Sequence, residues 1–170
     1  RAMEWLAQKQ DTLFLGQAVE FDGTAVTNTL RDVARSKLME MPVDEDFQMG
    51  LSIGLALNGT IPISIFPRWN FLLLAANQLV NHLDNLAIYS HGEFNPRVII
   101  RTAIGSKRPL DPQIQHTGDF TDGFRLMLNK VDIIRLEEPG EIFKAYQLAY
   151  ERQDSKSTIL VEYGDYLNEK

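Results

Sequence analysis

The sequence predicts an open α/β fold: a doubly wound, mostly parallel sheet with helices on both faces, in a single domain. Short apolar runs of strand length alternate with longer stretches of helical period, about five times along the chain. This alternation favours a parallel sheet that is covered on both sides. With 170 residues and no linker rich in Pro, Gly or Ser, the chain can bury one substantial core.

The first predicted elements are a strand, a helix and a second strand. Residues 12–19 form an apolar run of strand length, and residues 24–33 follow with helical period. Thr24 or Asp22 can cap this helix, because both side chains accept bonds from backbone N–H groups. Residues 38–43 then form a short second strand.

The middle of the chain contains a helix, a buried strand and the longest helix. Residues 46–58 have helical period and are followed by Gly59, a residue that often ends helices. Residues 61–66 are predicted to form a buried strand. Residues 70–86 are predicted to form the longest helix, capped by Asn70.

The second half of the chain continues the alternation around one long irregular segment, residues 105–118. Irregular segments of this length inside a compact domain are usually functional or disordered. Because this one follows a strand, we expect it at the ligand-binding edge of the sheet. The remaining predicted elements are strand 97–104, helix 119–128, strand 131–136, helix 140–152 and strand 157–163.

Composition argues against several classes of function. A net charge of −6 without a basic run makes non-specific nucleic-acid binding improbable, so we expect no nucleic-acid partner. The longest apolar stretch, residues 71–76, is too short to span a bilayer, and no signal peptide is visible. We therefore expect a cytoplasmic protein that does not bind membranes. The absence of cysteine removes disulfides and thiolate chemistry, and the three histidines lack the spacing of a helical zinc site.

The segment 41–54 places a carboxylate at a predicted strand-to-helix corner. Glu45 would lie at the positive end of the helix dipole, above the carboxyl end of a strand, where open α/β sheets bind ligands. From the residues alone, two interpretations remain open. Glu45 is either an ordinary first-turn acid that complements the dipole or a residue that contacts a ligand.

The predicted helix 70–86 is apolar on more than one face, which favours burial on both sides and, in a chain of this size, a subunit contact. We therefore expect a homodimer through this helix. Phe71, in its first turn, could stack on a flat ring or simply pack in the core. His82, on the same helix, is expected in the core or at the interface. His116, in the long irregular segment, is either a surface histidine or a residue that exchanges protons or binds a substrate carboxylate.

The motifs of several common enzyme classes are missing. The chain has no G-x-G-x-x-G turn and no Walker sequence, which disfavours a dinucleotide-binding domain. It also has no G-x-S-x-G elbow, so serine hydrolase chemistry has no support.

Together, these features resemble the pyrimidine-binding domain of transketolase-like thiamine diphosphate enzymes. The resemblance is greatest to the N-terminal domain of the beta subunit of 2-oxo acid dehydrogenase decarboxylases, and it covers residues 12–163. It rests on four groups of segments in the same order and spacing: residues 42–45 with 50–57, 70–71 with 77–82, 98–102, and 115–116.

The resemblance implies a cofactor, thiamine diphosphate, and a role for four residues. Glu45 matches the glutamate that hydrogen-bonds the pyrimidine ring and activates the cofactor. Val43, two residues earlier, matches a residue that touches the ring. Phe71 matches the aromatic residue stacked on the pyrimidine, and His116 matches the histidine near the thiazolium ring and the substrate.

The chain also departs from the family pattern. The family holds the diphosphate and magnesium on a separate domain with a Gly-Asp-Gly motif, but here Gly118-Asp119 is followed by Phe120 and Gly164-Asp165 by Tyr166. In place of the glycine-rich loop before the histidine stand residues 107–112, Lys-Arg-Pro-Leu-Asp-Pro. We therefore expect residues 1–170 to be one pyrimidine-binding-type domain, with neither the diphosphate-binding nor the C-terminal domain of the family.

The resemblance thus implies a chain that acts with a diphosphate-binding partner domain or subunit, which would hold the magnesium and share the cofactor. The reaction would be 2-oxo acid decarboxylation or ketol transfer, and the sequence leaves these two open. An alternative is a non-catalytic assembly or regulatory domain that kept the fold.

Overall fold

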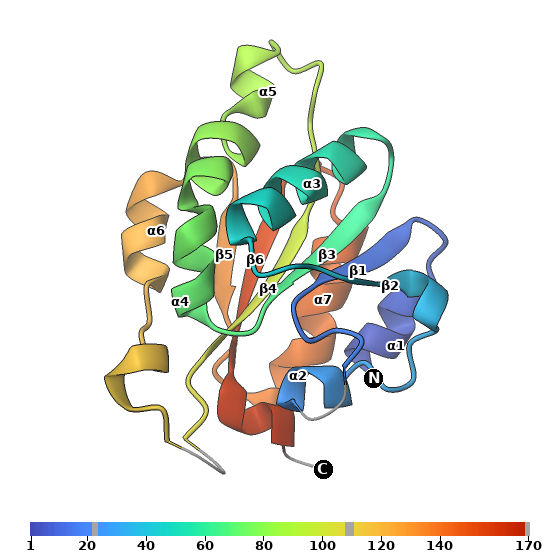
Figure 1. Ribbon diagram of the computed structural model, residues 1–170. Helices are drawn as coiled ribbons and strands as arrows, with labels where there is room; N and C mark the ends of the chain where they lie inside the picture. Colours follow the sequence, from blue (N-terminus) through green and yellow to red (C-terminus); the bar gives the residue numbers. More distant parts are fainter. Residues whose placement is uncertain (22–23, 108–110, 169–170) are drawn as a thin grey trace.

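The computed structural model describes residues 1–21, 24–107 and 111–168, and within them it contains a six-stranded sheet in which every neighbouring pair is parallel (Figure 1). The strand order is β2-β1-β3-β4-β6-β5. The predicted α/β fold with a parallel sheet is therefore confirmed. The strands are β1 Thr12–Gly16, β2 Leu38–Glu40, β3 Ile61–Phe66, β4 Ile99–Ile104, β5 Asp132–Arg135 and β6 Thr158–Tyr163.

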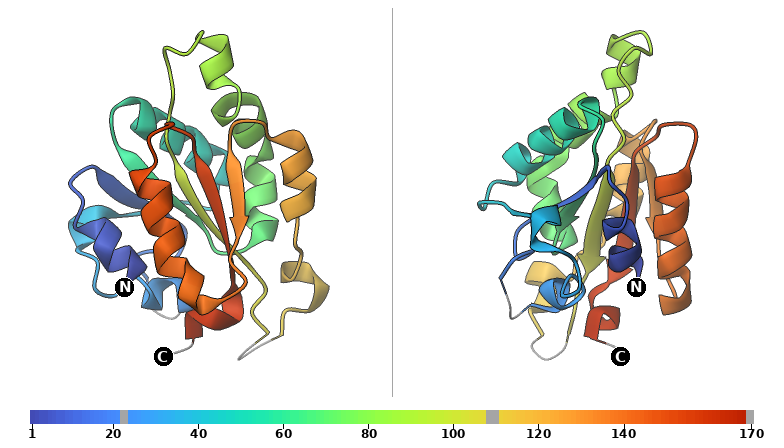
Figure 2. Two further views of the ribbon diagram at one scale, coloured as in Figure 1. Left: turned by 180° about the vertical axis from the view of Figure 1, so that it is seen from behind. Right: turned by 90° about the vertical axis from the view of Figure 1, so that its right-hand side faces the viewer.

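Helices cover both faces of the sheet. Figure 2 shows α1 and α7 on one face and α3, α4 and α6 on the other. The α-helices are α1 Ala2–Ala7, α2 Ala25–Asn28, α3 Glu45–Leu57, α4 Trp69–Leu72, α5 Leu86–Tyr89, α6 Thr121–Met127 and α7 Ile142–Glu151. Short 3₁₀ segments occur at Arg35–Lys37, Leu73–Ala75, Gln113–His116, Pro139–Glu141 and Gly164–Asn168, and a π-helical segment at Gln78–Leu83.

Each face of the sheet carries its own hydrophobic core, because successive side chains of a strand point to opposite sides. Ile63 of β3 and Leu160 of β6 belong to the core beneath α1 and α7. Phe66 of β3 and Val161 of β6 belong to the core beneath α3, α4 and α6. This two-sided burial explains why the strands are apolar without a regular polar alternation.

A polar cluster is buried in the core beneath α7. Arg101 of β4 donates to both oxygens of the Glu162 carboxylate, from Nε and Nη2, each at 3.0 Å. Tyr146 of α7 donates a short hydrogen bond to the same carboxylate. Burial and the neighbouring Glu162 carboxylate raise the pKa of Tyr146 well above its usual value of 10. For Arg101, burial opposes the charge, but Glu162 outweighs it and raises the pKa.

The prediction of one long helix over residues 70–86 was wrong in detail. The segment is helical, but it changes from α to 3₁₀ to π geometry, with the N–H of Asp84 bonding to the carbonyl of Leu79 five residues earlier. Its buried apolar positions, Leu72, Ala75, Leu79 and Leu83, keep a spacing of three or four residues, so the sequence pattern does not reveal the change of register.

Several predicted termini also differ from the structure. Arg68, and not Asn70, is the N-cap of α4. The Thr24 cap of α2 is confirmed, since its side chain accepts the N–H of Thr27, while the other candidate, Asp22, lies outside the described residues. His82 is exposed and does not lie in the core.

Strand β1 ends at Gly16, earlier than the predicted residue 19, because Ala18 adopts a left-handed conformation (φ 57°) that no strand continues. Among the described residues, no helix combines the length and hydropathy needed to cross a bilayer.

Candidate functional site

The predicted site residues gather at the carboxyl edge of the sheet. Glu45 is the first residue of α3, and the Asp44 side chain caps this helix by accepting the N–H of Phe47 at 3.0 Å. The Glu45 side chain is only 4% exposed. The predicted strand-to-helix corner is therefore present, and its carboxylate is buried, which is unusual for a first-turn acid that only complements a helix dipole.

The Glu45 carboxylate has one partner that the sequence analysis did not identify. Gln17 follows β1 directly, and its side-chain Nε2 donates to Oε1 of Glu45 at 3.0 Å. Oε2 of Glu45 has no hydrogen-bond partner among the described residues. The sequence contains no clear signal for Gln17, because it lies inside the strand predicted at residues 12–19, whereas the observed β1 ends at Gly16 and leaves Gln17 at the same edge as Glu45.

The turn that carries Gln17 is held by a second acidic side chain, Glu40 at the end of β2. Its carboxylate accepts three consecutive backbone N–H groups, from Ala18 at 2.7 Å, Val19 at 2.8 Å and Glu20 at 2.9 Å. Such a group of converging N–H donors is a typical anion-binding arrangement, here filled by the protein's own carboxylate. Glu40 therefore fixes the turn immediately after Gln17.

Phe71 and His116 are in direct contact. Phe71 lies in α4, directly after β3, and His116 ends the 3₁₀ segment Gln113–His116 in the long segment after β4. Their ring centroids are 5.2 Å apart, with 60° between the ring planes. Both residues are partly buried. The structure thus brings together two of the residues that the sequence analysis singled out.

Two buried polar atoms near this pair lack hydrogen-bond partners among the described residues: Nδ1 of His116 and Oδ1 of Asn70. Asn70 directly precedes Phe71, whose ring contacts that of His116, and a Cβ added to Gly118 would lie 3.4 Å from Nδ2 of Asn70. Buried polar groups are usually satisfied, so these two atoms are positions at which a ligand or an internal water could form a hydrogen bond.

The long segment after β4 emerges at the carboxyl edge, as predicted, and contacts at its start tie it to the body of the protein. Asp165 accepts the backbone N–H of Lys107 at 3.0 Å, and the guanidinium of Arg68 donates to the carbonyl of Gly105. Of the segment 107–112, residues 108–110 lie outside the described residues.

Val43 lies in the connection between β2 and α3 and is 83% exposed. It lies two residues before Glu45, at the same edge of the sheet. The structure therefore places Glu45, Val43, Phe71 and His116 at one edge, and it joins Phe71 to His116 by contact. No hydrogen bond joins Glu45 to Phe71 or His116 within the described part of the chain.

The two Gly-Asp sequences do not form a metal site. Asp119 accepts Nη1 of Arg135 at 3.0 Å, and Asp165 is bound to the backbone of Lys107. Burial acts against the charge of Asp119, but hydrogen bonds from Thr121 and Arg135 outweigh it and lower the pKa of this carboxyl group. Within the described part of the chain, no three His, Asp or Glu side chains are placed to hold a metal ion.

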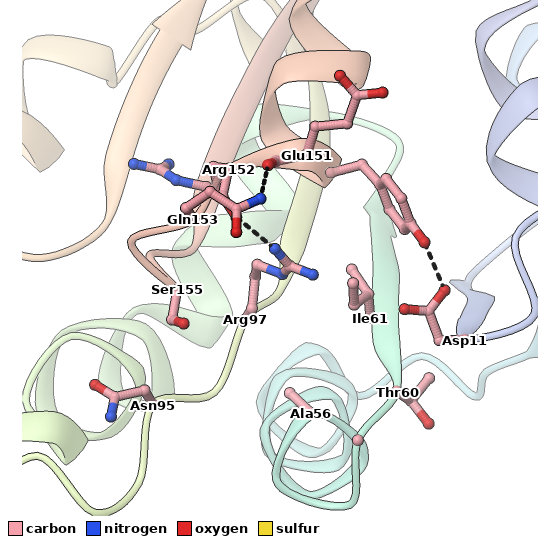
Figure 3. Close-up of a pocket in the computed structure, with 12 residues that line it drawn as sticks. Asp11, Ala56, Thr60, Ile61, Asn95, Arg97, Glu151, Arg152, Gln153 and Ser155 are labelled. Carbon is pink, nitrogen blue, oxygen red and sulfur yellow. Dashed lines mark hydrogen bonds between the residues drawn. The ribbon is translucent and has the colours of Figure 1, made fainter.

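The structure also contains a polar cavity of about 530 Å³ at the opposite, amino edge of the sheet (Figure 3). Arg97 lies in this cavity and donates to the carbonyl of Arg152 at 2.8 Å, and Tyr150 donates to Asp11 at 2.9 Å. None of Glu45, Val43, Phe71 and His116 lines it. The cavity is therefore separate from the candidate site.

Comparison of the sequence with known proteins finds no matching family model. The mitochondrial pyruvate dehydrogenase E1 component subunit beta of Ascaris suum is 28% identical over 127 residues, which are 72% of this chain and 35% of that protein. The corresponding subunit of Cyanidium caldarium is 38% identical over 65 residues, which are 38% of this chain and 20% of that protein. The aligned part of the chain thus spans about a third or less of these relatives.

Two solved structures share the fold. A split-gene transketolase, in the form of an inactive beta4 tetramer, matches with a TM-score of 0.71 and 16% identity, over 94% of this chain and 47% of that chain. A protein of Mycobacterium smegmatis assigned as a thiamin diphosphate-dependent enzyme matches with a TM-score of 0.66 and 13% identity, over 97% of this chain and 30% of that chain.

In sequence the chain is similar to the beta subunits of pyruvate dehydrogenase E1, and in fold it is similar to a split transketolase. The resemblance to transketolase-like pyrimidine-binding domains that the sequence predicts is thereby confirmed.

Proposed function

We propose that this chain supplies the pyrimidine half of a thiamine diphosphate site and acts with a diphosphate-binding partner domain or subunit, which holds the magnesium. The similarity to E1 beta subunits and the transketolase-like fold support this assignment. When bound, the cofactor would supply a nucleophilic carbon for reaction with the carbonyl group of a 2-oxo acid or a ketose. The expected compartment, the cytoplasm, is part of the proposal.

The observation that carries the proposal is the state of the Glu45 carboxylate. This side chain is buried at the start of α3, one oxygen is held by Gln17, and the other oxygen has no partner within the described chain. A carboxylate with one oxygen left without a partner is suited to accept an N–H group from a ligand, and the low exposure of Glu45 favours that bond because it limits competition from water. Its proposed partner is a ring nitrogen of the pyrimidine.

The neighbouring residues suit the flat ring that Glu45 would hold. Phe71 presents an aromatic ring at the same edge, packed against His116, so that its orientation is restrained. Val43, which is exposed, precedes Glu45 by two residues in the chain. His116 would face the reacting end of the substrate, where its imidazole can exchange a proton or bind a carboxylate.

The described residues offer no evident binding site for the diphosphate half of the cofactor. The carboxylates of Asp119 and Asp165 are both engaged in internal contacts, as given above. A diphosphate with its magnesium needs oxygen ligands and backbone N–H donors, which the partner would have to provide. This requirement motivates the split-site arrangement.

Exposed apolar side chains near the site provide a surface for assembly. Val43, Phe47, Leu73 and Leu74 are 83%, 53%, 38% and 63% exposed, respectively. We propose that this surface is covered in a homodimer through residues 70–86 or by the diphosphate-binding partner. It also favours a second candidate function, a non-catalytic assembly domain, because an apolar surface serves assembly whether or not Glu45 is catalytic.

Calorimetric titration with thiamine diphosphate and magnesium tests the proposal. The isolated chain should bind weakly, because it would contact only the pyrimidine. The same chain mixed with a diphosphate-binding partner should bind the cofactor tightly. Sub-micromolar binding by the isolated chain would contradict the split site, and no binding with the partner would favour the assembly domain.

A further inference from the structure

We propose that Gln17 is a positioning residue for Glu45, and that Glu40 fixes the turn from which Gln17 reaches it. This inference rests on the proposed function of Glu45. It assigns a role to two residues that the sequence analysis did not identify.

The turn that carries Gln17 is held from several directions. Glu40 accepts the N–H groups of Ala18, Val19 and Glu20, and the hydroxyl of Thr27 donates to the carbonyl of Ala18 at 2.7 Å. The side chain of Val19 is 1% exposed and belongs to the core beneath α1 and α7.

Strand β1 cannot shift easily at its end. A Cβ added to Gly16 would lie 2.3 Å from the carbonyl oxygen of Ile65, so the backbones of β1 and β3 approach too closely there for any side chain. The N–H of Met41 bonds to the carbonyl of Gly16 at 2.9 Å, which ties the same point to β2. Gln17 therefore projects from a position fixed on both sides.

This arrangement orients a carboxylate without adding charge to it. The Gln17 amide is neutral and donates to Oε1 of Glu45, so the pair carries only the charge of the carboxylate. Because Oε1 accepts this bond, rotation of the side chain is restrained, and Oε2 is left for a ligand. A longer or rotated contact to the ring would slow a proton transfer that depends on near-ideal geometry.

The coupling between the two side chains can be measured without any cofactor. We would determine the unfolding equilibrium constants of the complete chain, of Gln17→Leu, of Glu45→Leu and of the double variant. Residues in contact are coupled, so the effects should depart from additivity by at least about twofold in the equilibrium constant. Gln8→Leu, at an exposed glutamine in another part of the chain, should be additive with Glu45→Leu.

Additive effects at Gln17 and Glu45 would overturn the inference. If Glu45→Leu does not fold, Glu45→Ala and Glu45→Gln provide the same cycle with smaller perturbations. Their additivity with Gln17→Leu would count in the same way.

The positioning role is tested in the chain combined with its diphosphate-binding partner and thiamine diphosphate. Gln17→Leu should slow exchange of the thiazolium C–H proton into heavy water by roughly 10- to 100-fold, while the cofactor dissociation constant changes by less than about threefold. A purely structural role would lower affinity and exchange together. Gln8→Leu should leave both values unchanged.

The outcomes separate this inference from the proposed function. If Gln17→Leu exchanges at the normal rate while Glu45→Gln exchanges slowly, the positioning role of Gln17 is refuted and the proposed function is not. Absence of exchange in the unaltered complex would refute the proposed function and, with it, the positioning role.

Discussion

The imidazole ring of His116 packs against the phenyl ring of Phe71, with the ring centroids 5.2 Å apart. A residue from the segment after β4 thus rests on a residue from the first turn after β3. Parallel strands bring such connections to the same edge of a sheet, although the two residues are distant in the chain. The contact restrains both rings at the position where the proposed cofactor would lie.

Replacement of Phe71 by Leu should weaken binding of thiamine diphosphate to the complete complex by about tenfold. The variant removes ring stacking, which is worth roughly 0.5–1.5 kcal/mol beyond simple burial, and it also releases His116. Titration calorimetry of the complex measures the effect. Phe94→Leu, at an exposed residue outside the site, is the matched control and should bind normally. Equal affinity in both variants would mean that Phe71 is only a packing residue.

The sequence predicted the fold well because its signals were local and repeated. The apolar run 61–66 coincides with β3, and the helix predicted at residues 46–58 differs from α3 by one residue at each end. The break at residues 70–86 could not be predicted, because its apolar spacing also fits an ordinary helix. The short β1 depends on the bonds from Ala18, Val19 and Glu20 to Glu40, a contact between segments that no local pattern shows.

Three residues of the candidate site could be predicted, because each of them follows a predicted strand. Glu45, Phe71 and His116 follow three different predicted strands, so the rule that ligands bind at the carboxyl edge of a parallel sheet placed them together. Gln17 lies inside the strand predicted at residues 12–19, so the same rule could not place it at the edge, and it is outside the segments used for the resemblance. Its role becomes visible only from the 3.0 Å bond to Glu45.

Glu40→Ala should lower the free energy of unfolding by about 2–3 kcal/mol. The substitution leaves three backbone N–H groups without the charged acceptor that now binds them, and hydrogen bonds to charged groups contribute more than neutral ones. Denaturant unfolding followed by circular dichroism measures the loss. Glu93→Ala, at an exposed glutamate, should change stability by less than about 0.5 kcal/mol. A similar small effect at Glu40 would contradict the anchoring role of its carboxylate.

Stability should decrease in alkaline solution because of Tyr146. Burial and Glu162 raise the pKa of Tyr146 in the folded state, so the folded chain keeps the phenolic proton after the unfolded chain has lost it near pH 10. Above that pH the unfolded state binds fewer protons, and the free energy of unfolding falls by up to about 1.4 kcal/mol per pH unit.

Tyr146→Phe removes this ionisation. Between pH 10 and pH 11, its free energy of unfolding should therefore fall less steeply than that of the unaltered chain, by up to about 1.4 kcal/mol per pH unit. Urea unfolding at a series of pH values measures the difference. Tyr89→Phe, at an exposed tyrosine, should retain the slope of the unaltered chain. Equal slopes for all three proteins would show that Tyr146 titrates normally.

Leu74→Glu should reduce self-association. Leu74 is 63% exposed in the segment proposed as a subunit contact, and a charge there would be buried without a partner in a dimer. Sedimentation velocity at micromolar concentration should show a dimer or larger species for the unaltered chain and a monomer for this variant. Leu126→Glu, at a leucine of α6 that is 91% exposed, should leave the oligomer intact. A monomeric unaltered chain would contradict the proposed contact.

Exchange of the thiazolium C–H proton into heavy water, measured by quenched-flow NMR in the complete complex, tests the proposed role of Glu45 most directly. Glu45→Gln keeps the size of the side chain but not its charge. Exchange should therefore slow by roughly 10²- to 10⁴-fold, the range expected for loss of a positioned acid–base group, with only a modest fall in cofactor affinity. Asp46→Asn, which removes the next charge in the same helical turn, should exchange at the normal rate. If Glu45→Gln exchanges as fast as the unaltered complex, Glu45 is only a first-turn acid of α3 and the proposed function of this chain is wrong.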